Sequence, residues 1–219
     1  MGVGVESRNR IAQRAAKEIK DGMIVNLGIG IPTLVANYIP EEVHVMFHAE
    51  NGILGTGPSP APGEEDPNLC NAGGYPVTLQ PGASYFDSAV AFGMIRRGYL
   101  DITILGALEV SEKGDLANWI VPGKRVPGMG GAMELAQKAK KVIVLMNHVN
   151  KQGKSKILKQ CTLPLTAKEA VDLIITDMAV MEVTKDGLLL KEVMSPYTVE
   201  DVIQHTEAEL ILADRVTRL

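Results

Sequence analysis

The chain has 219 residues, of which 46% are hydrophobic and 22% charged, and this composition predicts one soluble globular domain over residues 1–219. The net charge of −4 and the aromatic content of 4% argue against duplex-binding and base-stacking proteins, so we expect no nucleic-acid partner. No apolar run is long enough to span a bilayer, and the opening MGVGVESRNR lacks the apolar core of a secretory signal. We therefore expect a cytoplasmic protein without membrane contact.

The first part of the chain predicts alternating helices and strands. A helix is expected over residues 6–20, a strand over 23–27, a proline-started helix from Pro32, and a strand over 43–47. Gly, Pro, Asn and Glu then dominate residues 50–81, a stretch too long for a simple connector. We interpret this stretch as a structured functional loop.

The rest of the chain continues the alternation. Helices are expected over 84–97, 132–140 and 198–206, and strands over 101–105, 142–146, 173–176, 179–183 and 188–191. Thr198 is a suitable N-cap for the last helix. Such alternation predicts a three-layer α/β/α sandwich on a mostly parallel sheet.

The segment Gly28-Ile29-Gly30 lies between a strand and a helix, where dinucleotide-binding proteins carry a glycine fingerprint. Glu50 follows about twenty residues later, where such folds place a ribose-binding carboxylate. The fingerprint fails at its third glycine, because Thr33 stands there. The pattern favours a tight strand-to-helix turn. A dinucleotide-dependent oxidoreductase, or a noncatalytic small-ligand sensor on a similar scaffold, remains an alternative.

The segment His48-Ala49-Glu50 matches half of a zinc deaminase motif, in which a histidine binds metal and a glutamate transfers protons. The second half, P-C-x-x-C, is missing from the sequence. The other histidines form no ligand pattern either. We therefore predict no metal site.

The segment Glu50-Asn51-Gly52 places a carboxylate at the end of a strand, followed by residues that favour a tight turn. Ligands of open α/β sheets bind at strand ends. A carboxylate presented there is a candidate functional group, although exposed loop acids are also common.

A series of segments in matching order resembles the beta subunits of family I CoA-transferases over nearly the whole chain. The segment that resembles the family's active site is Glu50-Asn51-Gly52-Ile53-Leu54-Gly55-Thr56-Gly57-Pro58. The others are NLGIGIP at 26–32, NAG at 71–73, PGAS at 81–84, GDLANW at 114–119, GMGGAM at 128–133, CTLPLT at 161–166 and TEA at 206–208. One departure is Ala49, where many members have serine.

The resemblance implies a CoA-transferase-like α/β fold and a reaction in which Glu50 is the nucleophile. Its carboxylate attacks an acyl-CoA thioester to form an acyl-glutamyl anhydride, and CoA then attacks the glutamyl carbonyl to give a glutamyl-CoA thioester. A second acid reverses the sequence, which predicts ping-pong kinetics. A glutamate is ionised at neutral pH, so neither a metal nor a permanently bound cofactor is needed, and CoA thioesters are substrates.

The resemblance also implies further site residues. A glycine amide of the family's oxyanion hole corresponds to Gly131, with Gly130 and Gly128 in the same loop. Asn118 resembles a CoA-contacting position. Asn26 and Asn51 are expected to support the site through amide hydrogen bonds, or to satisfy turns.

The CoA phosphates call for basic residues along the path of the substrate. The candidates are Lys124-Arg125, Arg96-Arg97 and residues 138–141, and the sequence alone does not choose among them.

The family's alpha subunit supplies a second half that 219 residues do not contain, so the resemblance implies a heteromer with an alpha-subunit partner that associates further. The pattern is most similar to succinyl-CoA:3-oxoacid transferases with acetoacetate as acceptor. Acetate- or butyrate-using relatives share the motifs.

Overall fold

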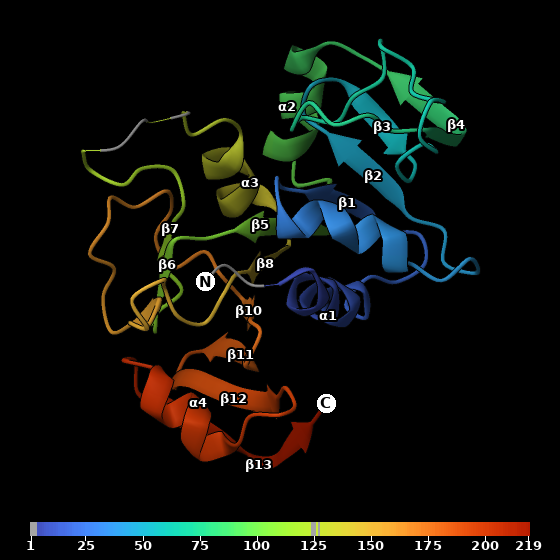
Figure 1. Ribbon diagram of the computed structural model, residues 1–219. Coiled ribbons are helices and arrows are strands. Elements are labelled where there is room, and N and C mark those ends of the chain that lie inside the picture. Colours follow the sequence, from blue (N-terminus) through green and yellow to red (C-terminus); the bar gives the residue numbers. More distant parts are fainter. Residues whose placement is uncertain (1–3, 124–125, 127) are drawn as a thin grey trace.

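The computed structural model describes residues 4–123, 126 and 128–219. Ten strands of this part of the chain form one sheet through the middle of the molecule (Figure 1). In spatial order they are β13 (Leu210–Arg218), β12 (Gly187–Val193), β11 (Ala179–Thr184), β10 (Leu173–Ile175), β8 (Lys141–Leu145), β5 (Ile102–Gly106), β1 (Ile24–Leu27), β2 (Met46–Ala49), β3 (Ile53–Thr56) and β4 (Leu79–Tyr85).

The central strands β2, β1, β5, β8 and β10 run parallel, so their carboxyl ends meet at one edge of the sheet. On one side β3 and β4 are added antiparallel. On the other side β11 and β12 alternate in direction, and β13 runs parallel to β12. The prediction of a mostly parallel sheet is confirmed for this centre, and strand ends there are the expected location of a site.

Side chains of the central strands alternate between two apolar cores, one on each face. In β8, Val142 and Val144 enter one core, whereas Ile143 and Leu145 enter the other. The first core is covered by α2 (Ser88–Arg96) and α3 (Ala132–Lys138), and the second by α1 (Val5–Ala16) and the 3-10 helix η1 (Ile31–Tyr38). Strands buried on both faces are typical of parallel sheets between helices, which confirms the three-layer α/β/α arrangement.

A smaller sheet of β7 (Leu116–Ala117), β6 (Glu109–Ser111) and β9 (Ile157–Leu158) follows β5. Near the carboxyl end of the chain lies α4 (Val199–His205), whose N-cap Thr198 and third residue Asp201 form a capping box. The prediction of a threonine cap at Thr198 is therefore confirmed. Among the described helices, none has both the length and the apolar character needed to cross a membrane.

The prediction of a loop over residues 50–81 is wrong at both ends, because β3 and the first part of β4 lie within it. Leu54 of β3 pairs with His48 and with Ser84, so two short strands extend the sheet beyond β2. Ser84 and Tyr85 belong to β4 rather than to the predicted helix, which begins at Ser88. Glycine and proline obscure the strand pattern here, and pairing with β2 determines the structure.

Two further differences concern the type and number of elements. The proline-started helix is a 3-10 helix, not an α-helix. The strands β6, β7 and β9 of the smaller sheet and the strand β13 were not predicted from the sequence. The exposed residues of β13 reflect an edge strand with one neighbour.

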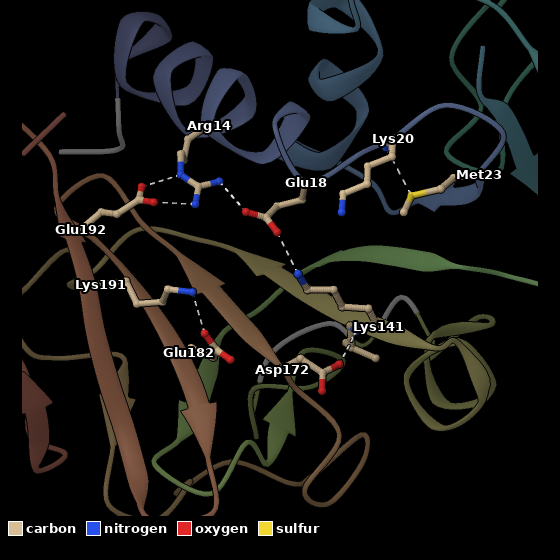
Figure 2. A network of polar contacts seen from close by, with 10 residues as sticks. Arg14, Glu18, Lys20, Met23, Lys141, Asp172, Glu182, Lys191 and Glu192 are labelled. Carbon is tan, nitrogen blue, oxygen red and sulfur yellow. Dashed lines mark hydrogen bonds and ion pairs between the residues drawn. The ribbon is translucent and has the colours of Figure 1, made fainter. Parts of the chain in front are cut away.

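An ionic network attaches α1 to two strands of the sheet (Figure 2). Arg14 of α1 donates through Nη2 to Glu192 of β12 at 2.8 Å and through Nη1 to Glu18 at 2.7 Å. Glu18 also accepts from Nζ of Lys141 in β8 at 2.8 Å. The buried guanidinium therefore has paired acceptors, as a charge in this position requires.

Candidate active site

Glu50 lies directly after β2 at the carboxyl edge of the parallel strands, where its side chain is half-buried. The chain reverses immediately after it, because the amide of Gly52 donates to the carbonyl of Ala49 at 3.0 Å. Gly52 has a φ of 122°, and a Cβ at this position would lie 2.2 Å from the carbonyl oxygen of Phe86. Only glycine fits this turn, and the turn fixes where Glu50 is presented.

Asn26 of β1 contacts the carboxylate of Glu50. Its Nδ2 donates to Oε2 of Glu50 at 3.1 Å and to the carbonyl of His48 at 3.0 Å. Asn26 is only 1% exposed and pairs with His48 in the register of β1 and β2. A hydrogen bond to a carboxylate from a buried, fixed donor holds that carboxylate in one orientation.

Gly131 also lies close to Glu50. It is the N-cap of α3, and a Cβ built on it would lie 3.6 Å from Cγ of Glu50 and 3.2 Å from two ring atoms of Phe92. Gly130 and Gly128 have φ values of 55° and 99° and face open space. The missing side chain of Gly131 therefore lets the start of α3 approach the Glu50 side chain closely, and of the three glycines only Gly131 would bring an added Cβ near it.

His48 precedes Glu50 by two residues and points to the same face of β2. Its Nε2 lies 3.2 Å from the carbonyl of Ala91, and its ring stacks on Phe86 with centroids 6.2 Å apart. Burial lowers the pKa of His48, and the Ala91 carbonyl and the charge of Glu50 offset only part of that shift. The imidazole is therefore neutral at pH 7 and packs between α2 and the sheet. In the described part of the chain, no three His, Cys, Asp or Glu side chains are grouped to hold a metal ion.

The other two predicted asparagines hold neighbouring loops. Asn51 donates through Nδ2 to the carbonyl of Cys70 at 2.9 Å. Asn118 donates to the carbonyl of Gly106 at 3.1 Å, and its Oδ1 accepts from Thr166 at 2.6 Å. Neither side chain is directed at Glu50 by these bonds. The structure thus brings together Glu50, Asn26 and Gly131, whereas Asn51 and Asn118 fix segments beside them.

The two glycines of the fingerprint-like segment have different structural roles, one in packing and one in backbone conformation. A Cβ on Gly28 would lie 3.1 Å from the carbonyl oxygen of Ile104, so the glycine allows β1 to end against β5. Gly30 has a φ of 92° and precedes the 3-10 helix η1. The α-helix whose N-terminus would hold a pyrophosphate is not formed there, which weakens the dinucleotide alternative.

Several of the basic residues considered for CoA phosphates pair with carboxylates. Arg96 contacts Glu134 at 2.8 Å, and Lys140 contacts Asp101 at 2.8 Å. Lys141 belongs to the network of Figure 2. Lys124 and Arg125 lie outside the described residues.

A pocket of about 340 Å³ lies beside β2, and the sequence patterns did not predict it. Its walls include Phe47, His48 and Ala49 of β2 and Thr33 and Leu34 of η1, whereas Glu50, Asn26 and Gly131 are not among its described lining residues. Among the described residues that line it, Arg8 of α1 is the one charged side chain. One signal could have indicated this residue: Arg8 precedes the buried Ile11 and Ala12 by three and four positions, on the apolar side of α1.

The fold and the site together define a class of protein: an α/β domain that presents a glutamate at the carboxyl edge of its sheet, beside a glycine-rich helix start. Comparison with known proteins gives the family. The model of the family "Coenzyme A transferase" matches residues 8–205, and the chain belongs to that family as a beta-type subunit.

Three relatives illustrate the similarity. The chain is 62% identical to the beta subunit of a probable coenzyme A transferase of Bacillus subtilis, covering 96% of this chain and 97% of that protein. It is 54% identical to the corresponding subunit of a probable succinyl-CoA:3-ketoacid coenzyme A transferase of the same organism, covering 96% and 98%. It is 48% identical to the beta subunit of an acetate CoA-transferase of Escherichia coli, covering 95% of each.

A solved structure agrees with the fold. The acyl-CoA transferase YdiF of Escherichia coli O157:H7, as an apoenzyme, superposes with a TM-score of 0.80 at 20% identity. The match covers 100% of this chain and 44% of the YdiF chain, so this chain spans less than half of that protein.

Proposed function

We propose that the chain is the catalytic subunit of a CoA-transferase that moves CoA from succinyl-CoA to a 3-oxoacid such as acetoacetate, through a glutamyl-CoA thioester on Glu50. The observation that carries this proposal is that the Glu50 carboxylate accepts from the buried amide of Asn26 while the Glu50 side chain lies close to Gly131. A carboxylate held on one side by a single amide keeps an oxygen available for attack on a thioester carbonyl.

The reaction proceeds by exchange at carbonyl carbons. An oxygen of Glu50 attacks the carbonyl carbon of the donor thioester, the C–S bond breaks, and CoA leaves as the thiolate while an acyl-glutamyl anhydride remains on the enzyme. The thiolate then attacks the glutamyl carbonyl, which releases the donor acid and leaves a glutamyl-CoA thioester. The acceptor carboxylate reverses these steps. Over the whole cycle one thioester is broken and one is formed, so no permanently bound cofactor is required.

Each attack produces a tetrahedral oxyanion that needs fixed hydrogen-bond donors. The loop that contains Gly128, Gly130 and Gly131 is the candidate source. Backbone amides near Gly131 can approach the reacting carbonyl, because the side of the loop that faces Glu50 carries no side chain at this position.

The substrate assignment is supported by the relative named as a succinyl-CoA:3-ketoacid coenzyme A transferase subunit. The pocket beside β2, the strand that presents Glu50, is a candidate acyl site. Its walls mix polar and apolar side chains, and the guanidinium of Arg8 supplies a cation for a carboxylate at the far end of an acyl chain. Such a pocket suits a succinyl group better than an acetyl or butyryl group. The alternative is that the chain belongs to an acetate/butyrate–acetoacetate transferase, and the relative named as an acetate transferase supports it.

A partner chain follows from the lengths of the relatives. Two relatives whose chains this one covers almost completely are each named as one subunit of a coenzyme A transferase. The YdiF chain is more than twice as long. We therefore expect an alpha subunit to complete the enzyme, in a heteromer that associates further and in which this chain alone has little activity.

Borohydride reduction tests the proposed function. Borohydride reduces a thioester, so it should inactivate the assembled enzyme only after treatment with acetoacetyl-CoA or succinyl-CoA. Untreated enzyme serves as the control and should keep its activity. Equal loss of activity with and without acyl-CoA would contradict the covalent mechanism, and binding of NAD without any effect of acyl-CoA would favour the oxidoreductase.

A further inference from the structure

A row of polar groups crosses three strands beneath Glu50. Asn26 of β1 pairs with His48 of β2 on one side and with Thr103 of β5 on the other. All three side chains are at most 2% exposed. The two neighbours of Thr103 in β5, Ile102 and Ile104, are apolar and buried, so the hydroxyl of Thr103 lies between two apolar side chains of the strand.

The hydroxyl of Thr103 donates to Oδ1 of Asn26 at 3.3 Å. The same amide donates through Nδ2 to the carbonyl of His48 and to Glu50. Each end of the Asn26 side chain therefore has a partner, and one buried hydrogen-bonded path leads from β5 to the carboxylate.

We infer that Thr103 is a positioning residue for the nucleophile: its hydroxyl holds the Asn26 amide so that Nδ2 faces Glu50. Without this donor, Oδ1 of Asn26 would be buried with no hydrogen-bond partner among the residues that the structure describes. The amide would then rotate toward another donor or admit water. Either change moves Nδ2 away from Glu50 and lets the carboxylate leave its attacking orientation. Small displacements of reacting groups slow catalysis strongly.

The inference rests on the proposed role of Glu50, and substitutions of nearly equal volume test it. Thr103→Val removes the hydroxyl and keeps the shape of the side chain, whereas Thr103→Ser keeps the hydroxyl. The matched control is Thr176→Val: Thr176 is equally buried, but its hydroxyl bonds to His148 and Ala179, far from Glu50 along the sheet. Each variant is prepared as the complex with the alpha subunit.

The measurement is the single-turnover rate at which acetoacetyl-CoA forms the CoA adduct of Glu50, followed by intact mass, together with kcat and KM. We expect Thr103→Val to slow adduct formation and kcat by about ten-fold with KM within about two-fold, because Thr103 does not contact substrate. Thr103→Ser should restore the rate to within about two-fold of the unmodified enzyme. Thr176→Val should lower the unfolding temperature without slowing the adduct step.

The outcomes distinguish a failure of the proposed function from a failure of the Thr103 role. If the unmodified enzyme turns over but forms no adduct, the proposed function fails. If that enzyme forms the adduct and Thr103→Val forms it equally fast, the positioning role of Thr103 is wrong. If Thr103→Val does not fold, Thr103→Cys replaces it, because a thiol is a weaker hydrogen-bond donor of similar size. The inference would be overturned if Thr103→Cys and Thr103→Ser both formed the adduct as fast as the unmodified enzyme.

Discussion

The amide of Asn26 and the carboxylate of Glu50 meet at 3.1 Å although they come from different strands, β1 and β2. The contact is possible because the two strands are parallel and adjacent, so a residue near the end of one lies beside the residue that follows the other.

Replacing Asn26 by Ala should lower kcat by about ten- to a hundred-fold and change KM little, since the amide orients Glu50 and does not bind substrate. Steady-state kinetics with acetoacetyl-CoA measure this, and a change confined to KM would contradict it.

The close approach of Gly131 gives a second prediction. Gly131→Ala adds a methyl group 3.2 Å from the ring of Phe92 and 3.6 Å from Glu50 Cγ, at a φ of −82° that alanine adopts without strain. We expect kcat to fall by about ten-fold or more, because the ring or the carboxylate must move.

Gly128→Ala is the control for this experiment. It introduces strain at a φ of 99° but faces open space. It should lower stability by about 1–2 kcal/mol with a smaller loss of kcat than Gly131→Ala. Thermal unfolding measures the stability of both variants, and steady-state kinetics measure their kcat. A larger loss of kcat in Gly128→Ala than in Gly131→Ala would refute the assignment of Gly131 as the glycine close to Glu50.

Arg8 should determine which acyl groups are preferred. Arg8→Ala removes the cation of the pocket, so KM for succinyl-CoA should rise by about ten-fold while KM for acetyl-CoA stays within about two-fold. Arg8→Lys, which keeps the charge, should recover part of the loss. Equal changes in KM for both donors would show that Arg8 does not recognise a distal carboxylate.

The network of Figure 2 predicts a pH-dependent contribution to stability. Burial raises the pKa of Glu18, but the hydrogen bonds and charges of Lys141 and Arg14 outweigh it and hold the pKa below its ordinary value. A depressed carboxyl pKa stabilises the fold above the pKa of the unfolded chain, about 4.3, and this contribution is lost as the pH falls through the folded value. Glu18→Gln should lower the free energy of unfolding by about 1–3 kcal/mol at pH 7, with a smaller difference near pH 4.

The control for the network is the more exposed pair of Lys191 and Glu182, also drawn in Figure 2. Glu182→Gln should change the free energy of unfolding by less than about 1 kcal/mol at pH 7. Urea unfolding at several pH values provides the comparison. A Glu18→Gln penalty that grows as the pH falls would contradict the stated sign.

The sequence predicted the central strands well, because β5, β8 and β10 are short apolar runs with nothing to obscure the pattern. It predicted Glu50 beyond the end of a strand, but it placed that strand over residues 43–47, whereas β2 is Met46–Ala49. It could not distinguish the roles of the asparagines, since Asn26, Asn51 and Asn118 are one residue type and only their tertiary partners differ. Thr103 carried no motif at all, and its importance depends on the pairing of β5 with β1.

The central claim is that Glu50 carries CoA covalently, and intact-mass analysis tests it most directly. The enzyme assembled with its alpha subunit is incubated with acetoacetyl-CoA, and the CoA adduct is mapped by peptide analysis beside Glu50→Gln, which cannot form it. We expect one adduct on the peptide that contains Glu50, none in the variant, and a loss of kcat in the variant of at least about 1,000-fold. Full turnover without an adduct, or an adduct on another residue, would contradict the account.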